Sequence, residues 1–163
     1  MKIMIADAHK GIMQPLPFSF VTTAEAIDAV HPEYSFPGDI RVEGKAEFTG
    51  SAWRVSGVIS CEKAFVCDRC LGSFKEHQEH EFAEEFQHTP ADGDVNVFEG
   101  DYIDISGLVR DTILAAQPMK SLCRPDCRGL CPKCGADLNK GDCGCDRFVP
   151  DPRLADLQQL LKK

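Results

Sequence analysis

A chain of 163 residues with 43% hydrophobic and 27% charged residues is long enough for one soluble globular domain, or for one domain with a small appended module. It has no apolar run of about 18 residues, which argues against a transmembrane helix, and its first residues lack the apolar stretch of a signal peptide. The net charge of −8 is uneven: residues 1–122 carry 10 basic and 20 acidic side chains, giving −10, and residues 123–163 carry 8 and 6, giving +2. An acidic body disfavours non-specific binding to nucleic acid, so any RNA contact is expected in the second segment.

The first half of the chain predicts mostly strands. Strands are expected over 2–8 and 15–21, the second held at a sheet edge by its two prolines. A helical turn or two is expected over 22–30, capped by Thr22 or Thr23. Three segments then mix apolar and polar positions between Gly, Ser or Asp boundaries, which predicts an antiparallel meander with one face in water. These segments are 39–48, 52–67 and 73–87.

The second half adds a loop and two helices. Residues 89–94 are expected as a loop. Residues 104–118 predict a short strand that runs into a helix, with Ser106 as its cap and Pro118 stopping it. The clearest helix is expected over 151–163, where leucines form a stripe on one face.

These elements predict an α+β fold. It combines an antiparallel β-meander and a few short helices with a small cysteine-rich zinc-binding C-terminal module and a final amphipathic helix. The division is expected as an acidic meander domain over 1–118 and the cysteine-rich module with its helix over 119–163.

Nine cysteines lie along the chain, and eight of them form four close pairs. The protein is expected to be cytoplasmic, where thiols stay reduced, so such pairs indicate metal binding. The stretch CPKCG at 131–135 is typical of a metal knuckle, because Gly135 permits the positive φ that closes the turn. The pairs predict two tetrahedral sites, one of Cys131, Cys134, Cys143 and Cys145 and one of Cys67, Cys70, Cys123 and Cys127. Cys61 is left over as a small buried side chain on a strand.

Zinc is the expected metal, with one or two ions per chain, because structural zinc sites are commonly tetrahedral and closed by four thiolates. Iron in a rubredoxin-like centre is the alternative, since the ligand set does not separate the two metals. Three other interpretations concern single motifs. The pair at 67 and 70 can be an ordinary reduced CxxC in a turn. The CxxxCxxC spacing at 127–134 matches radical-SAM cluster ligands, but the chain is too short for a typical barrel. The histidine-rich stretch 75–88 lacks HExxH and predicts a solvated acidic strand face.

Several stretches resemble one known family. They are GVISCEKAFVCDRCLGSF, LVRDTILAAQPMKSLCRPDC, and GLCPKCGADLN with CGC and DPRLADLQQLL after it. From about residue 35 to its end the chain is similar to the bacterial YceD family, also filed as domain of unknown function 177. That family is associated with accumulation of the large-subunit ribosomal RNA, and its genes often neighbour one for a large-subunit ribosomal protein. The resemblance implies a non-enzymatic factor in 23S rRNA processing or 50S subunit assembly.

The residues themselves also argue against an enzyme, because closed four-thiolate sites leave no position for a reacting water. The alternative function is a zinc-thiol redox switch or redox-regulated chaperone, which releases its metal on oxidation; a protein–protein adaptor is a further one. The expected partner is a pre-50S particle, 23S rRNA or a large-subunit ribosomal protein, with no membrane and no small-molecule substrate. The expected contact surface is the cationic cluster beside the metal loops: Arg124, Arg128, Lys133, Lys140 and Arg147.

Overall fold

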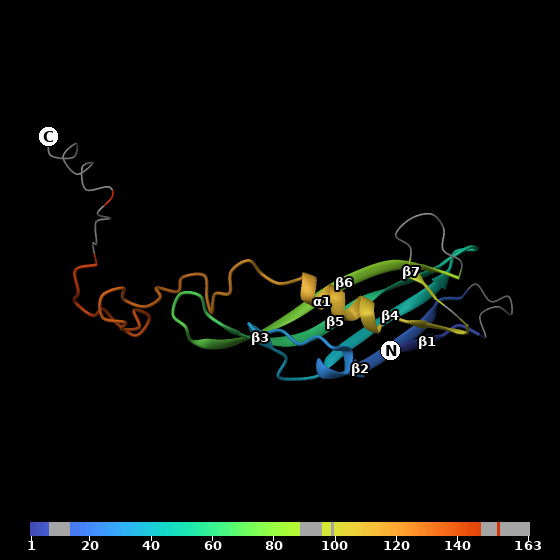
Figure 1. Ribbon diagram of the computed structural model, residues 1–163, viewed down its shortest axis with the longest axis horizontal. Coiled ribbons are helices and arrows are strands. Elements are labelled where there is room, and N and C mark those ends of the chain that lie inside the picture. Colours follow the sequence, from blue (N-terminus) through green and yellow to red (C-terminus); the bar gives the residue numbers. More distant parts are fainter. Residues whose placement is uncertain (7–13, 89–95, 99, 148–152, 154–163) are drawn as a thin grey trace.

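The computed structural model describes residues 1–6, 14–88, 96–98, 100–147 and 153. Long, twisted strands form the body of an elongated molecule, and the cysteine-rich segment extends from one end of it (Figure 1). Antiparallel strands dominate, and one α-helix lies among the described residues. The α+β class is therefore confirmed.

The main sheet has the strand order β2–β4–β5–β6–β7, and β3 pairs with the C-terminal end of β5. Its strands are β2 (Leu16–Thr22), β3 (Tyr34–Ser35), β4 (Ile40–Phe48), β5 (Trp53–Val66), β6 (Ser73–Gln87) and β7 (Asn96–Val97). The pairs from β2 to β6 are antiparallel, as a meander requires, and β2 lies at the edge. β7 runs parallel to β6 and was not predicted, because two residues are too few to show a period.

The inner face of the sheet follows from the two-residue period of β5. Its buried side chains alternate along the strand: Trp53, Val55, Ile59, Cys61, Lys63 and Phe65. Gly57 interrupts the series opposite Gly44 of β4. A Cβ on Gly57 would lie 3.0 Å from the Phe82 ring, and one on Gly44 would lie 2.7 Å from the Phe18 ring. Either Cβ would also lie 2.3 Å from a backbone carbonyl oxygen of the other strand, so the paired glycines allow β4 and β5 to approach closely and leave room for the two rings.

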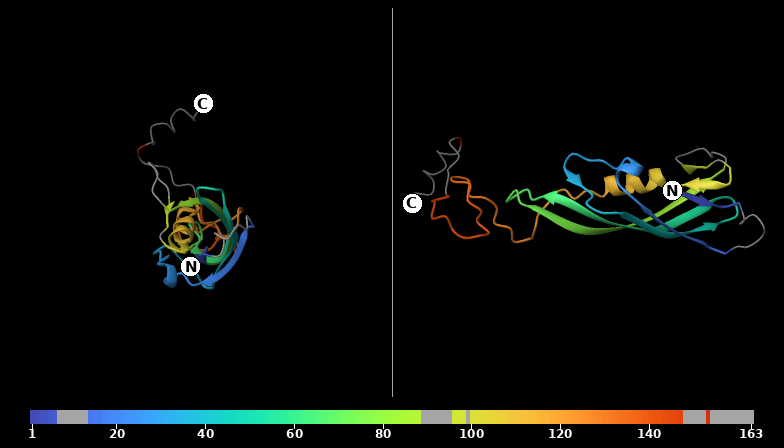
Figure 2. Two further views of the ribbon diagram at one scale, coloured as in Figure 1. Left: turned by 90° about the vertical axis from the view of Figure 1, so that its right-hand side faces the viewer. Right: turned by 90° about the horizontal axis from the view of Figure 1, so that it is seen from below.

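The sheet curves around α1 (Ser106–Ala115), which covers its inner face (Figure 2). Val109 and Ile113 of the helix are fully buried. The expectation that Ser106 caps the helix is wrong, because Ser106 is itself the first helical residue. Its N–H donates to Asp104 Oδ1 at 2.9 Å, and its hydroxyl accepts a hydrogen bond from the amine of Met1.

Two smaller elements complete the core. β1 (Lys2–Met4) pairs antiparallel with β8 (Tyr102–Asp104), the short strand that leads to α1. The turn η2 (Glu25–Ile27) is a single 3₁₀ turn, shorter than the one or two helical turns expected. Its N-cap residue is Ala24, so the cap expected at Thr22 or Thr23 is wrong, although Thr23 Oγ1 accepts the N–H of Ala26 at 3.4 Å.

One buried charge lies where the sheet meets the helix end. Lys63 has no exposed surface, and its Nζ donates to the carbonyl oxygen of Ile113 at 2.8 Å. The same Nζ lies 4.9 Å from the centre of the Tyr34 ring. The lysine therefore satisfies a carbonyl group of the last helical turn, where a positive charge also meets the negative end of the helix dipole.

Some expected elements fall outside the described ranges. They are the end of the first strand at 7–8, the loop at 89–94, and the final helix over 151–163 apart from Arg153. Within the described part of the chain, no helix has the length and apolar character needed to cross a bilayer.

Candidate metal centres

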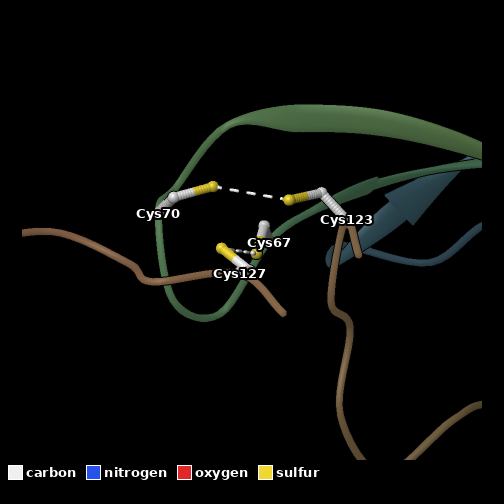
Figure 3. Close-up of side chains that lie close together, drawn as sticks. All are labelled: Cys67, Cys70, Cys123 and Cys127. Atoms are coloured by element: carbon white, nitrogen blue, oxygen red, sulfur yellow. Dashed lines mark hydrogen bonds between the residues drawn. The ribbon is translucent and has the colours of Figure 1, made fainter. Parts of the chain in front are cut away.

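Four cysteines from distant parts of the sequence meet at the end of the long strands (Figure 3). Cys67 and Cys70 lie in the turn between β5 and β6, and Cys123 and Cys127 lie in the segment that follows α1. Their four sulfur atoms all lie within 4.8 Å of one another. Cys67 and Cys127 are buried. We call this group the first tetrad.

The spacing of these sulfurs fits a metal ion. The Sγ atoms of Cys67 and Cys127 are 3.9 Å apart, and those of Cys70 and Cys123 are 3.7 Å apart. A tetrahedral ion with Zn–S bonds of about 2.3 Å places its sulfurs about 3.8 Å apart. A disulfide requires only about 2.05 Å. The first tetrad can therefore hold a metal ion, and its sulfurs are too far apart to be disulfide-bonded.

The second tetrad is local in sequence. It consists of Cys131, Cys134, Cys143 and Cys145, whose sulfurs also lie within 4.8 Å of one another. The structure thus brings together the same two sets of four cysteines that the sequence spacing predicts, and each set can hold a metal ion. The turn Gly144, between the last two ligands, has a φ of 69° that glycine adopts without strain.

Both tetrads are built on the same backbone turn. In the second, the N–H of Gly135 donates to the carbonyl oxygen of Cys131 at 2.8 Å, and Gly135 has the expected positive φ of 73°. In the first, Leu71 donates to Cys67 at 2.9 Å with a φ of 56°. A left-handed leucine is uncommon, so sequence alone does not reveal that CDRCL closes as CPKCG does.

The backbone of each turn directs N–H groups at its first sulfur. Burial raises the pKa of Cys67, but the N–H groups of Cys123, Cys70 and Arg69 outweigh it and bring the pKa down to about 6. In the second tetrad the N–H groups of Cys134 and Lys133 lower the pKa of Cys131 to about 6. Each turn thus favours the thiolate form of its first cysteine.

One other thiol in each tetrad has a strongly raised pKa. Burial and hydrogen bonds to the neighbouring sulfurs raise the pKa of Cys123 to about 12. Hydrogen bonds to Cys134 and Cys143, together with burial, raise that of Cys145 to about 12. Four thiolates at these distances repel one another, so each tetrad reaches its fully ionised form only with a cation among the sulfurs.

The segment after Gly129 docks directly on the first turn. The N–H of Leu130 donates to the carbonyl oxygen of Arg69 at 3.1 Å, and Arg69 Nη1 donates to the carbonyl oxygen of Cys127 at 2.8 Å. Gly129 has a φ of 72°, and a Cβ on it would lie 2.8 Å from the carbonyl oxygen of Arg69. Glycine is therefore required at this close approach.

The cationic residues predicted as a contact surface divide into two classes. Three of them form ion pairs within the module: Arg124 with Asp126, Lys140 with Asp137, and Arg147 with Asp142. Within the described ranges, the side chains of the exposed residues Arg128 and Lys133 form no ion pair or hydrogen bond. Among the described residues, only these two of the five predicted side chains are exposed without an ion-pair partner.

Sequence reasoning missed the side chains that position the ligands. Asp68, inside the first CxxC, binds the segment before Cys123, and Asn139 contacts Cys127 from the loop of the second tetrad. Asp and Asn are common in turns for local reasons, so a long-range contact from them leaves no pattern in sequence.

Comparison with known proteins identifies the family. A family model described as "Large ribosomal RNA subunit accumulation protein YceD" matches residues 55–161, a span that includes both tetrads. The chain belongs to the YceD family. The resemblance seen in the cysteine motifs is thereby confirmed. No solved structure gave a significant match.

Relatives of this YceD-family chain occur in several bacteria and in a plant. YlbN, an uncharacterised protein of Bacillus subtilis, is 29% identical over 168 residues, which is 100% of this chain and 98% of that protein. An uncharacterised Mycobacterium tuberculosis protein is 29% identical over 130 residues, 76% of this chain and 60% of the relative. The chloroplastic "Large ribosomal RNA subunit accumulation protein YCED homolog 1" of Arabidopsis thaliana is 40% identical over 58 residues, 36% of this chain and 18% of the plant protein.

Proposed function

We propose that this YceD-family protein is a non-enzymatic cytoplasmic factor in 23S rRNA accumulation or processing, or in assembly of the 50S ribosomal subunit. The observation that carries the proposal is the family match over 55–161, because the family is named for accumulation of the large ribosomal RNA. Two groups of four thiols support a scaffolding role, since four protein ligands close the coordination sphere of a metal to substrate.

We further propose that the eight tetrad cysteines bind two zinc ions. The spacing of the sulfurs and the purely thiol donor set support zinc, with iron as the alternative. Bound zinc would supply a rigid tetrahedral cross-link without redox chemistry. On this proposal residues 1–118 form the sheet domain and 119–163 the zinc module, and the first zinc joins the two.

The charges support the zinc module as the contact surface. Each four-thiolate zinc site carries −2, so two sites change the formal charge from −8 to about −12. Such a protein is repelled by rRNA unless its cations are concentrated in one place. Arg128 and Lys133 lie beside the two tetrads, are exposed, and have no acidic partner within the described ranges. We propose that these two contact the pre-50S particle, through phosphates of 23S rRNA or through a large-subunit ribosomal protein, with Arg124, Lys140 and Arg147 in secondary positions.

A charge-reversal experiment tests the contact surface. Arg128→Glu with Lys133→Glu should abolish co-sedimentation with pre-50S particles at moderate salt while zinc content and melting temperature stay as in the wild type. The matched control is Arg41→Glu with Arg54→Glu, two exposed arginines on the sheet, which changes the net charge equally. An equal loss in both variants would show that only net charge matters and would contradict the assignment.

A depletion experiment tests the function itself. Depletion of the protein should lower mature 23S rRNA and accumulate pre-50S particles, while 16S rRNA is unchanged. Normal 23S rRNA and normal 50S particles after depletion would overturn the proposal. Crosslinking of the tagged protein, with and without RNase treatment, then assigns the contact to rRNA or to a ribosomal protein.

A further inference from the structure

Asn139 belongs to the loop between the two ligand pairs of the second tetrad, yet its side chain reaches the first tetrad. Its Nδ2 donates to the Sγ of Cys127 at 3.4 Å and to Asp137 Oδ1 at 2.8 Å. Its Oδ1 accepts from Arg124 Nη2 at 2.7 Å and from the N–H of Arg128 at 2.8 Å. An asparagine amide offers two donor hydrogens and two acceptor positions, and all four are used here.

The backbone around Asn139 is held against the same segment. The N–H of Leu138 donates to the carbonyl oxygen of Gly129 at 3.0 Å, and Leu130 forms an isolated β-bridge with Asp137. Leu138 is buried beneath this contact. The loop that closes the second tetrad and the segment that carries Cys127 therefore form one packed unit.

This unit makes the position of Asn139 depend on the second tetrad. Residues 135–142 run between the ligands Cys134 and Cys143, so a metal bound there fixes both ends of the loop. A fixed loop holds the side-chain amide Nδ2 of Asn139 toward the Cys127 sulfur, where a donor stabilises the negative charge that a ligand thiolate carries. Without that metal the loop loses its closure, and the first tetrad loses an ordered donor.

We propose that Asn139 couples the two tetrads, so that metal bound at the second tetrad raises the metal affinity of the first. This inference rests on the proposed binding of two zinc ions. Coupling between two binding sites is reciprocal, so metal at the first tetrad raises the affinity of the second by the same factor.

The order in which the two tetrads bind metal follows from the separation of their ligands along the sequence. The ligands of the second tetrad lie within residues 131–145, whereas Cys70 and Cys123 of the first tetrad are 53 positions apart. Closing the shorter span costs less chain entropy. The second tetrad therefore binds metal before the first tetrad does. Its bound metal then raises the metal affinity of the first tetrad.

Zinc titration of the metal-free protein, followed by native mass spectrometry, tests the coupling. At one equivalent of zinc the wild type should contain mainly metal-free and two-zinc species. Asn139→Ala should raise the one-zinc species about twofold for a coupling factor of about ten. Asn96→Ala, a change of the chain's other asparagine on β7, should behave as the wild type. Asn139→Asp provides a second variant, because it keeps the acceptor oxygen and removes the donor to Cys127.

A thermodynamic cycle makes the test quantitative. Cys143→Ser with Cys145→Ser removes the second tetrad, and zinc affinity of the first is then measured by chelator competition. We expect this change to lower the affinity at least about tenfold when Asn139 is present, within the usual range of coupling, and much less in the Asn139→Ala background. Equal losses in both backgrounds, or no loss in either, would overturn the coupling while two bound zinc ions in the wild type uphold the metal sites. A wild type that binds no zinc would overturn both.

Discussion

Asp68 and Ser121 hold each other by two reciprocal hydrogen bonds. The N–H of Asp68 donates to the carbonyl oxygen of Ser121 at 2.8 Å, and the N–H of Ser121 donates to Asp68 Oδ2 at 2.7 Å. Asp68 lies between Cys67 and Cys70, and Ser121 lies two residues before Cys123. The two ligand pairs of the first tetrad are therefore aligned by protein contacts.

The first prediction concerns this clamp. Asp68→Ala removes the acceptor for the N–H of Ser121 and should destabilise the docked segment by about 1 kcal/mol. Amide hydrogen exchange over 119–127 should become faster, while exchange in β4 and β5 is unchanged. Asp68→Asn keeps an acceptor oxygen and is the matched control. Equal protection in Asp68→Ala and the wild type would show that the clamp does not hold the segment.

The second prediction is stoichiometric. The protein purified from cells should contain two zinc ions per chain, because the structure offers two tetrads. Cys67→Ser with Cys70→Ser should lose the zinc of the first tetrad and keep that of the second. Elemental analysis measures both values. One zinc in the wild type, unaffected by this double change, would remove the first tetrad from the assignment.

The third prediction concerns metal removal. Among the described residues of 119–147, the buried side chains are those of Cys127, Cys131 and Leu138, which form too small a core to order the segment. Structural zinc contributes on the order of 10–16 kcal/mol in small peptides, as much as the ~5–15 kcal/mol stability of a whole domain. A strong chelator should therefore abolish amide protection over 123–145, and Cys134→Ser should do so over 131–145, while the sheet stays protected in both cases. Unchanged protection over 123–145 would contradict a metal-ordered module.

The fourth prediction compares two glycines that both have positive φ. Gly135→Ala should lower stability by only about 1 kcal/mol, because a Cβ there meets no atom within 4 Å and the cost is backbone strain alone. Gly129→Ala should cost clearly more, since its Cβ would lie 2.8 Å from the carbonyl oxygen of Arg69. The zinc affinity of each tetrad, measured by chelator competition in the two variants, reports this difference, because metal binding is coupled to folding of the turns. Equal losses of affinity in the two variants would show that the backbone at Arg69 can move away at little energetic cost.

The fifth prediction concerns the buried lysine. Burial lowers the pKa of Lys63 below its ordinary 10.5, while Cys61 and Glu76 oppose the shift; His80 and Tyr34 also lie near its charge. Above the lowered pKa the unfolded state binds more protons than the folded state, so stability rises with pH from there to about 10.5. Below that window both states are charged, and the dependence disappears.

Lys63→Met removes this titration and provides the comparison. In urea unfolding at a series of pH values, the free energy of unfolding of the protein with Lys63 should rise relative to that of Lys63→Met across the window. Both proteins carry Cys61→Ser, because burial raises the pKa of the Cys61 thiol and the charge of Lys63 itself lowers it. A difference between the two proteins that does not vary with pH would mean that Lys63 keeps its ordinary pKa.

The long strands were predictable because their side chains alternate over many residues. β6 has the predicted bounds of 73–87, and β4 and β5 agree within one residue at each end. Short elements have no such pattern. β7, with two residues, and the single turn η2 are too short to show a period, and α1 begins at Ser106 itself, whose hydroxyl accepts a hydrogen bond from the amine of Met1.

In the candidate metal sites, too, the local patterns were predictable and the long-range contacts were not. A spacing of one to three residues between cysteines reveals the pairs, because a turn brings such neighbours to one point. It does not reveal contacts that depend on the tertiary path, such as the clamp at Asp68 or the amide of Asn139. The left-handed Leu71 shows the limit within one motif, since its neighbours and not its own preference set its φ.

The first tetrad also has a consequence for biosynthesis. A chain made from its N-terminus exposes Cys70 53 residues before Cys123 is added. During that interval β6 and α1 are completed, and the turn holds two thiols with no partners for a tetrahedral site. The nascent protein therefore passes through a stage in which the turn between β5 and β6 is an open half-site, and the later segment with Cys123 and Cys127 closes it.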